Sequence, residues 1–335
     1  MDLVPLTALR SAVLVKHALA SAVVLSALAL GGCAASTHAV EPAKLGQSSR
    51  SGKLLEVIDQ PGPIEAETVV STAWAVSRAG LINLDNPTAK AAGLIDGDEP
   101  IEIYFHVIRH PDKGVFLIDT GVEKALRDSP EKAAIQGLVA KEMHVEKMGF
   151  KKPLADFLAE QKKPVSGVFF THLHLDHASG APDLPKSTPI YAGPGETSAR
   201  AFLNMFTQGT ADRQLDGLPT LGEWKFSPDP DGLFEGVLDV FGDGSFWALY
   251  TPGHTPGSTS YLARTAQGPI LFVGDTCHTR WGWEAEVEPG GYTADHAKNR
   301  ESLLKLRRLV REHPKIQVRL GHQPIERVML PRADK

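Results

Sequence analysis

The sequence contains very little cysteine: Cys33 and Cys277 are the only two in 335 residues. A structural zinc site made of four cysteines is excluded by this count, and a site made of two cysteines and two histidines would require both of them. At most one disulfide can form within the chain.

Positive charge and long apolar runs are also scarce. The chain has 35 Lys and Arg residues against 40 Asp and Glu, a net charge of −5, so a surface that binds nucleic acid is not expected. An uncharged apolar run covers residues 18–30, and its 13 residues are too few to span a bilayer as a helix of the mature protein. With 42% hydrophobic and 22% charged residues, the composition is that of a globular protein.

The N-terminal segment has the layout of a secretion signal. Arg10 and Lys16 precede the apolar run, which ends at Leu30-Gly31-Gly32-Cys33. This tetrapeptide resembles the bacterial lipobox, in which the cysteine is lipidated and becomes the first residue of the mature protein. We therefore predict a lipoprotein signal peptide over residues 1–32, with conventional cleavage near Cys33 as the alternative.

Lipidation of Cys33 would hold the mature protein in the bacterial cell envelope by a lipid anchor. The residue after Cys33 is Ala34 rather than aspartate, and by resemblance to sorted lipoproteins this favours the outer membrane, with the protein facing the periplasm. Loss of residues 1–32 removes two basic residues and one acidic residue, which leaves 33 against 39 and a net charge of −6. Cys277 would then have no partner for an internal disulfide.

The remaining chain divides into a linker and one domain. Residues 33–62 are rich in Ser, Ala, Lys, Gly and Pro with little periodicity, which predicts a tether between membrane and domain. Residues 63–335 alternate between strand and helix patterns. We expect strands over 67–74, 101–108, 115–118, 165–170, 189–192, 237–241, 246–250, 259–263, 269–273 and 316–320, and helices over 153–161, 196–206 and 293–313.

The densest group of metal-binding residue types is His172-Leu173-His174-Leu175-Asp176-His177, directly after an apolar strand pattern. In an extended segment alternate residues share a face, so His172 and His174 can bind one metal. Where the chain curls after the strand, Asp176 and His177 point elsewhere, toward a second metal or the protons beside it. The alternative is that these histidines lie in a surface loop and bind no metal. It does not explain why three histidines and one aspartate occur within six residues.

Three further residues of this kind lie at predicted strand ends. His254 lies within Thr-Pro-Gly-His-Thr-Pro-Gly-Ser, Asp275 follows Val-Gly, and His322 follows Gly321. Loops at strand ends are where a rigid sheet presents functional groups. The other histidines without such context are interpreted as surface or hydrogen-bonded residues: His38, His106, His110, His144, His296 and His313.

Together these motifs resemble the metallo-β-lactamase superfamily, over roughly residues 65–327, and within it most closely the N-acyl-homoserine lactonases. The resemblance implies an α+β fold, a four-layer αββα sandwich with a dinuclear metal site at the sheet edge. It assigns His172, His174 and His254 to one ion, Asp176, His177 and His322 to the other, and Asp275 as the bridge. Imidazoles and carboxylates without thiolates suit Zn²⁺, with Mn²⁺, Fe²⁺ and Co²⁺ as alternatives.

The resemblance implies a hydrolase acting on a small molecule. A hydroxide shared by two divalent ions would attack a carbonyl of a lactone or other ester-like bond, with Asp176 handling the proton. Other family activities stay open: glyoxalase-II-like thioesterase, zinc β-lactamase and phosphotriesterase. A mononuclear-iron persulfide dioxygenase, and a binding lipoprotein with a structural metal, are the alternatives from other classes. Protein partners cannot be inferred from the sequence.

His278 stands where the homoserine lactonases carry a tyrosine that donates a hydrogen bond to the substrate carbonyl. We expect it to contact the substrate or the developing oxyanion, with an indirect or surface role as the alternative. Tyr292 is the next donor to consider. Large apolar residues recur at helical spacing at Phe202, Met205 and Phe206, and two more follow Asp275 at Trp281 and Trp283. Such residues pack in the hydrophobic core more often than they line a substrate pocket.

Overall fold

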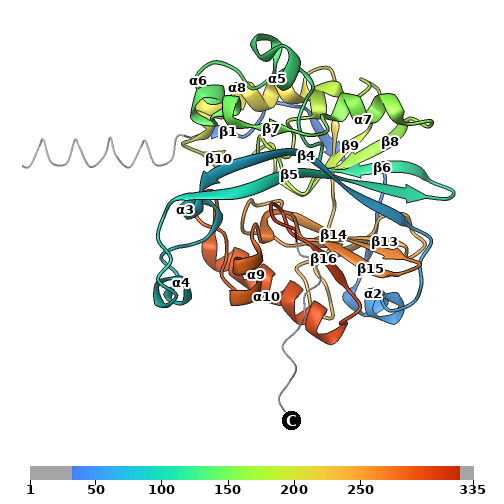
Figure 1. The fold of residues 1–335 in the computed structure, drawn as a ribbon. Helices are drawn as coiled ribbons and strands as arrows, with labels where there is room; N and C mark the ends of the chain where they lie inside the picture. Colours follow the sequence, from blue (N-terminus) through green and yellow to red (C-terminus); the bar gives the residue numbers. More distant parts are fainter. Residues whose placement is uncertain (1–31, 325–335) are drawn as a thin grey trace, which may run out of the picture.

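The computed structural model describes residues 32–324. Two sheets pack face to face, one of eight strands in the order β2-β11-β9-β8-β6-β5-β4-β7 and one of six in the order β16-β15-β14-β13-β12-β3. Helices cover both outer surfaces (Figure 1), so the predicted four-layer αββα sandwich is confirmed. The predicted signal peptide lies outside the described residues, apart from Gly32.

The eight-stranded sheet combines a long hairpin with a parallel half. Strands β4 and β5 pair antiparallel along nearly their whole length, while β6, β8 and β9 run parallel. Strand β8 is buried at four of its five positions, because the sheet is covered on both faces. The bounds are β2 Val40–Pro42, β4 Glu65–Ser77, β5 Asp98–His110, β6 Gly114–Ile118, β7 Gly149–Phe150, β8 Val165–Phe169, β9 Ile190–Ala192 and β11 Leu221–Glu223.

The six-stranded sheet contains the predicted hairpin, in which β12 and β13 pair antiparallel. Its members are β3 Gln47–Ser49, β12 Val237–Asp239, β13 Phe246–Tyr250, β14 Thr259–Thr265, β15 Gly268–Phe272 and β16 Gln317–Arg319. Between the two sheets lies an aromatic core in which Phe169 contacts the rings of Phe116, Trp224, Phe246 and Tyr261. A third, two-stranded sheet joins β1 Cys33–Ala34 to β10 Arg200–Ala201.

Helices α5, α6, α7 and α8 lie outside the larger sheet, and α2, α9 and α10 outside the smaller one (Figure 1). Helix α10 buries Leu303, Leu306 and Val310 against the smaller sheet, as its periodicity predicts. No helix within residues 32–324 combines the length and apolarity needed to cross a bilayer. The bounds are α2 Ser51–Val57, α3 Arg78–Leu81, α4 Pro87–Ala91, α5 Ala125–Asp128, α6 Gly137–Glu142, α7 Leu154–Glu160, α8 Asn204–Leu215, α9 Arg280–Ala285 and α10 His296–Glu312, with short 3₁₀ turns η1 Pro130–Lys132, η2 Val145–Lys147, η3 Ala181–Asp183 and η4 Gly274–Thr276.

The prediction of a tether over residues 33–62 was wrong. Strand β2 adds to the edge of the larger sheet beside β11, and β3 adds to the smaller sheet beside β12. Ala43 and Leu45, between these strands, pack against the core that contains Trp224. Backbone hydrogen bonds hold short edge strands in place, and these bonds need no hydrophobic periodicity in the sequence.

The helix predicted over residues 196–206 was also misplaced. The helix in this region is α8, which begins at Asn204, while a turn occupies the residues before β10. Gly195 has a φ of 80°, which breaks a helix, and the side chain of Glu196 is turned inward to accept hydrogen bonds.

Candidate metal centre

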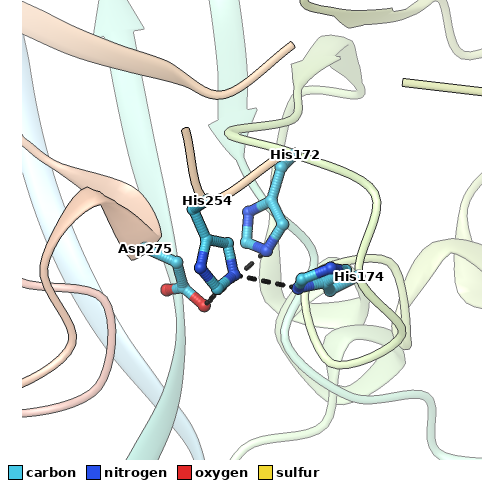
Figure 2. Close-up of side chains that lie close together, drawn as sticks. All are labelled: His172, His174, His254 and Asp275. Atoms are coloured by element: carbon cyan, nitrogen blue, oxygen red, sulfur yellow. Dashed lines mark hydrogen bonds and ion pairs between the residues drawn. The ribbon is translucent and has the colours of Figure 1, made fainter. Parts of the chain in front are cut away.

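The first group of candidate ligands combines three loops that end neighbouring strands. His172 and His174 follow β8, His254 lies between β13 and β14, and Asp275 follows β15 in η4. Figure 2 shows their side chains converging on one point. One potential ligand atom from each of the four lies within 4.8 Å of the others. The Nε2 atom of His254 is 2.9 Å from Nδ1 of His174 and 3.5 Å from Oδ2 of Asp275.

A second group shares Asp275 with the first. It consists of Asp176, His177, Asp275 and His322, whose ligand atoms also lie within 4.8 Å of one another. Oδ2 of Asp275 is 3.2 Å from Nε2 of both His177 and His322. The structure therefore brings all seven predicted ligands into two adjacent groups that have one carboxylate in common.

Several buried atoms at the centre have no hydrogen-bond partner. These are Nε2 of His172, His177 and His278, and Oδ1 of Asp275. In two of the candidate ligands, the ring nitrogen that faces away from the centre is hydrogen-bonded. Nδ1 of His177 donates to Asp119 at 2.8 Å, and Nδ1 of His322 donates to the backbone carbonyl of Glu102 at 3.1 Å. This arrangement directs the Nε2 lone pairs inward and is how proteins orient metal-binding imidazoles, so the residues fit divalent ions.

The electrostatics of the centre also suit cations. Burial, together with neighbouring imidazoles, lowers the pKa of His172 and His254 well below the usual value. Burial opposes the charged form of His177 and His322 as well, but nearby carboxylates outweigh it and raise the pKa of both rings. Protons on these two rings therefore balance the buried carboxylates, and divalent ions would take over that role while releasing the protons.

Asp119 orients the metal loop from the turn after β6. Its backbone has a φ of 56°, and its carboxylate accepts hydrogen bonds from the backbone N–H of Thr171 at 2.7 Å and from Nδ1 of His177. The sequence pattern Asp119-Thr120-Gly121 marks a turn after a strand, but it does not by itself reveal this contact. The tertiary structure places that turn beside the histidine loop.

Glu196 joins the two histidine loops, and sequence reasoning missed it. One carboxylate oxygen accepts from the backbone N–H of Leu173 at 2.7 Å, and the other accepts from the N–H of Gly257 at 2.9 Å and from the hydroxyl of Thr255. The side chain is buried, and burial raises its pKa to about 7. A single glutamate after Gly193-Pro194-Gly195 gives no sequence signal for such a contact.

Helix α10 fixes the loops that carry His254 and Asp275. The side chain of Asp295 caps the helix by accepting from the N–H of Lys298 at 2.9 Å. Just before the helix, the N–H of Ala294 donates to the carbonyl of His254. Within the helix, the buried Asn299 donates to the carbonyl of Thr276 at 3.0 Å. Both ligand loops are therefore attached to the most regular helix of the fold.

His278 is buried at the same centre. Its Nε2 lies 2.9 Å from Oδ2 of Asp275, and its Nδ1 donates to the carbonyl of Leu81 at 3.2 Å. Because Nδ1 carries the hydrogen in that bond, Nε2 of a neutral ring presents a lone pair, and it donates only when the ring holds a second proton. Tyr292 is 54% exposed in the loop before α10.

The aromatic stripes separate into two different environments. Trp283 is fully buried against α10 and Trp281 is partly buried, as expected for core residues. Phe202, Met205 and Phe206 are 62%, 52% and 55% exposed, so for them the core interpretation was wrong. The six other histidines within residues 32–324 all have polar partners, as predicted: Pro219 for His38, Thr68 for His106, Asp243 for His110, Glu146 for His144, Pro289 for His296 and Asp59 for His313.

The chain is similar in sequence to proteins that are named as lactonases. The N-acyl homoserine lactonase AttM of Agrobacterium fabrum is 32% identical over 161 residues, 48% of this chain and 59% of that protein. The AttM protein of Rhizobium johnstonii is 29% identical over 230 residues, 68% of this chain and 84% of its own. The chain thus spans about three fifths of the length of the first of these relatives.

Solved structures agree on the fold. A quorum-quenching N-acyl homoserine lactone lactonase superposes with a TM-score of 0.55 at 19% identity, covering 79% of this chain and 93% of its own. AidC, described as a dizinc quorum-quenching lactonase, gives a TM-score of 0.51 at 15% identity, with coverage of 84% and 92%. The family model described as the metallo-beta-lactamase superfamily matches residues 100–322. The chain therefore belongs to the metallo-β-lactamase superfamily.

Proposed function

We propose that this protein is a metal-dependent hydrolase that opens a lactone or another ester-like bond with two bound divalent ions, Zn²⁺ being the best fit. The observation that carries the proposal is the pair of ligand groups sharing Asp275. The presence of two complete ligand groups also favours a site for two ions over the single iron site of a persulfide dioxygenase. The AttM relatives, which are named as lactonases, favour a lactone over a thioester, β-lactam or phosphotriester.

In this proposal His172, His174 and His254 hold one ion, Asp176, His177 and His322 hold the other, and Asp275 bridges them. Bound there, the pair of ions would supply a shared hydroxide at neutral pH and polarise the substrate carbonyl.

The chain's own residues prepare the site for that chemistry. Five of the seven ligand side chains are buried, whereas His174 and Asp176 are partly accessible, and the side chain of Asp176 is 19% exposed. Its Oδ2 lies 3.3 Å from Nε2 of His322. Asp176 is therefore the carboxylate placed both to bind an ion and to exchange a proton with an incoming substrate.

His278 is the second residue to which we assign a catalytic role. Its buried ring lies beside Asp275, in reach of a carbonyl bound at the same centre. The contact with Leu81 fixes the ring orientation, so that a ring protonated on both nitrogens would be preorganised to donate from Nε2 to the substrate carbonyl or the developing oxyanion.

We also propose that the mature protein is anchored in the bacterial envelope through a lipid on Cys33, at the outer membrane and facing the periplasm. This rests on the tetrapeptide ending at Cys33 and on the charged and apolar segments before it.

The function is tested by a hydrolysis screen of the zinc-loaded protein against lactones, thioesters, β-lactams and phosphotriesters. We expect the highest kcat/KM for lactones, and loss of activity when a chelator removes the metals. Faster turnover of any other class would reassign the substrate, and full activity without metal would refute the metal-dependent mechanism.

A further inference from the structure

Four exposed apolar side chains lie together where β10 leads into α8. Phe202, Leu203, Met205 and Phe206, which we call the apolar patch, are 62%, 55%, 52% and 55% exposed. The rings of Phe202 and Phe206 are in edge contact with their centroids 5.8 Å apart. The other large exposed apolar residues of the described chain come singly from separate segments: Val40, Leu55, Ile95, Leu138 and Tyr292. A concentrated apolar surface of this kind marks an interaction site.

The predicted lipid attachment point lies directly beside this patch. Cys33 is the first residue of β1, and it is paired with Ala201 of β10, the neighbour of Phe202. The side chain of Asn204, between Leu203 and Met205, donates to the carbonyl of Cys33 at 3.1 Å. Figure 1 shows β1, β10 and α8 close together at one end of the larger sheet.

The residues directly after Cys33 are hydrogen-bonded to helix α8, so they cannot act as a flexible spacer between a membrane and the domain. Gln208 of α8 donates to the carbonyl of Ala34 at 2.8 Å. The hydroxyl of Ser36 and the backbone N–H of Thr37 donate to Asp212 of the same helix, both at 2.7 Å. Paired strands are about 5 Å apart, so a lipid on Cys33 would leave the protein within about that distance of Ala201.

We propose that the apolar patch is a membrane-docking surface, inserted at the boundary of headgroups and acyl chains in the bilayer that holds the Cys33 lipid. The patch would supply a second membrane contact beside the lipid, which adds to the binding strength and restricts how the domain orients on the bilayer. A bilayer is the occupant that the geometry favours, because the lipidated residue and the patch are hydrogen-bonded neighbours. The inference rests on the proposed lipid anchor and is independent of the proposed hydrolase activity.

Docking would also set the position of the metal loop. Gln214, near the far end of α8, donates to the carbonyl of Leu175 at 2.8 Å, next to the candidate ligand Asp176. Gln214 is eight residues after Phe206, which is roughly 12 Å along a helix axis. The metal loop would therefore lie close to the membrane surface, within reach of substrates that carry an acyl chain.

The test measures the depth of single sites in the membrane-bound full-length protein. Leu203→Cys and Ile95→Cys are each labelled with a polarity-sensitive fluorophore; Ile95 is 74% exposed and serves as the matched control. Native Cys277 is buried and a lipidated Cys33 has no free thiol, so labelling is selective. The proteins are reconstituted into phosphatidylethanolamine and phosphatidylglycerol vesicles with brominated acyl chains, and only floated protein is measured.

We expect brominated chains to quench the probe at position 203 at least about threefold more than the probe at position 95. Adding Phe202→Gln and Phe206→Gln to Leu203→Cys should reduce that quenching toward the control level. Equal, weak quenching at both sites in floated protein, or failure of the protein to float, would overturn the proposal. The proposal would also be overturned if the emission of the probe at position 203 showed a nonpolar environment but was not quenched by bromine. If that emission then depended on protein concentration, the patch would be assigned to contact with a second copy of the chain. If the mass of the protein showed that residues 1–31 were retained, the patch would be assigned to contact with that segment.

Discussion

At the scale of single residues, Asp275 has the most contacts within the candidate metal centre. Its Oδ2 lies 2.9–3.6 Å from a ring nitrogen of five histidines: His172, His177, His254, His278 and His322. Asp275→Ala removes the only carboxylate common to both ligand groups. We expect metal analysis to fall from about two divalent ions per chain to one or none, with most of the activity lost. An active Asp275→Ala protein with unchanged metal content would refute the dinuclear proposal.

His278 is predicted to act on the substrate without determining metal content. His278→Ala removes a preorganised group, so kcat/KM should fall on the order of ten- to a hundredfold while two ions per chain remain bound. Metal analysis and steady-state kinetics on the same preparation check this. A loss of metal would instead identify the Nε2 lone pair as a ligand, and unchanged kinetics would make Tyr292 the next donor to test.

Glu196 is predicted to make the stability of the protein depend on pH. Burial raises its pKa to about 7 from 4.5, so between these values the folded state binds the proton more tightly than the unfolded state. The free energy of unfolding should therefore fall as pH rises through this window, by up to about 3 kcal/mol. Glu196→Gln lacks the titration, so the Tm of the wild type should decrease relative to the variant from pH 5 to pH 8. A constant difference in Tm would contradict the assignment.

At the scale of secondary-structure elements, strands β2 and β3 complete the two sheets. Without residues 33–49, the edges of β11 and β12 lose their partners, and the core around Trp224 loses Ala43 and Leu45. A protein beginning at residue 50 should melt more than about 5 °C below one beginning at residue 33, and it should aggregate more readily through the open edges. Equal Tm values by calorimetry would show that these two strands add no stability to the fold.

At the scale of the whole molecule, the proposed location depends on one cysteine. Cys33→Ser removes the acceptor of the predicted lipid, so the protein should leave the membrane fraction or become mislocalised. Fractionation followed by immunoblotting checks this, with Cys277→Ser as the matched control because that thiol is buried in the core. A Cys33→Ser protein that remains as fully with membranes as the parent would refute the lipid anchor.

The sequence by itself determined the fold and the residues gathered at the candidate centre. The metal motifs are local: His172, His174 and His177 lie within six residues, and His254 has a distinctive octapeptide around it. Regular periodicity identified α10 and the central strands, because the burial of one face leaves a repeating apolar pattern.

Only the tertiary structure decided the features that depend on partners distant in the chain. Asp119 is 58 residues from His177, and Glu196 is 61 residues from Gly257, so neither contact has a local signal. Strands β2 and β3 are held by backbone hydrogen bonds to strands formed much later in the chain, which is why their side chains looked like a linker. The exposure of Phe202 and Phe206 was likewise decided by packing, because helical spacing of apolar residues does not say whether that face meets protein or remains open.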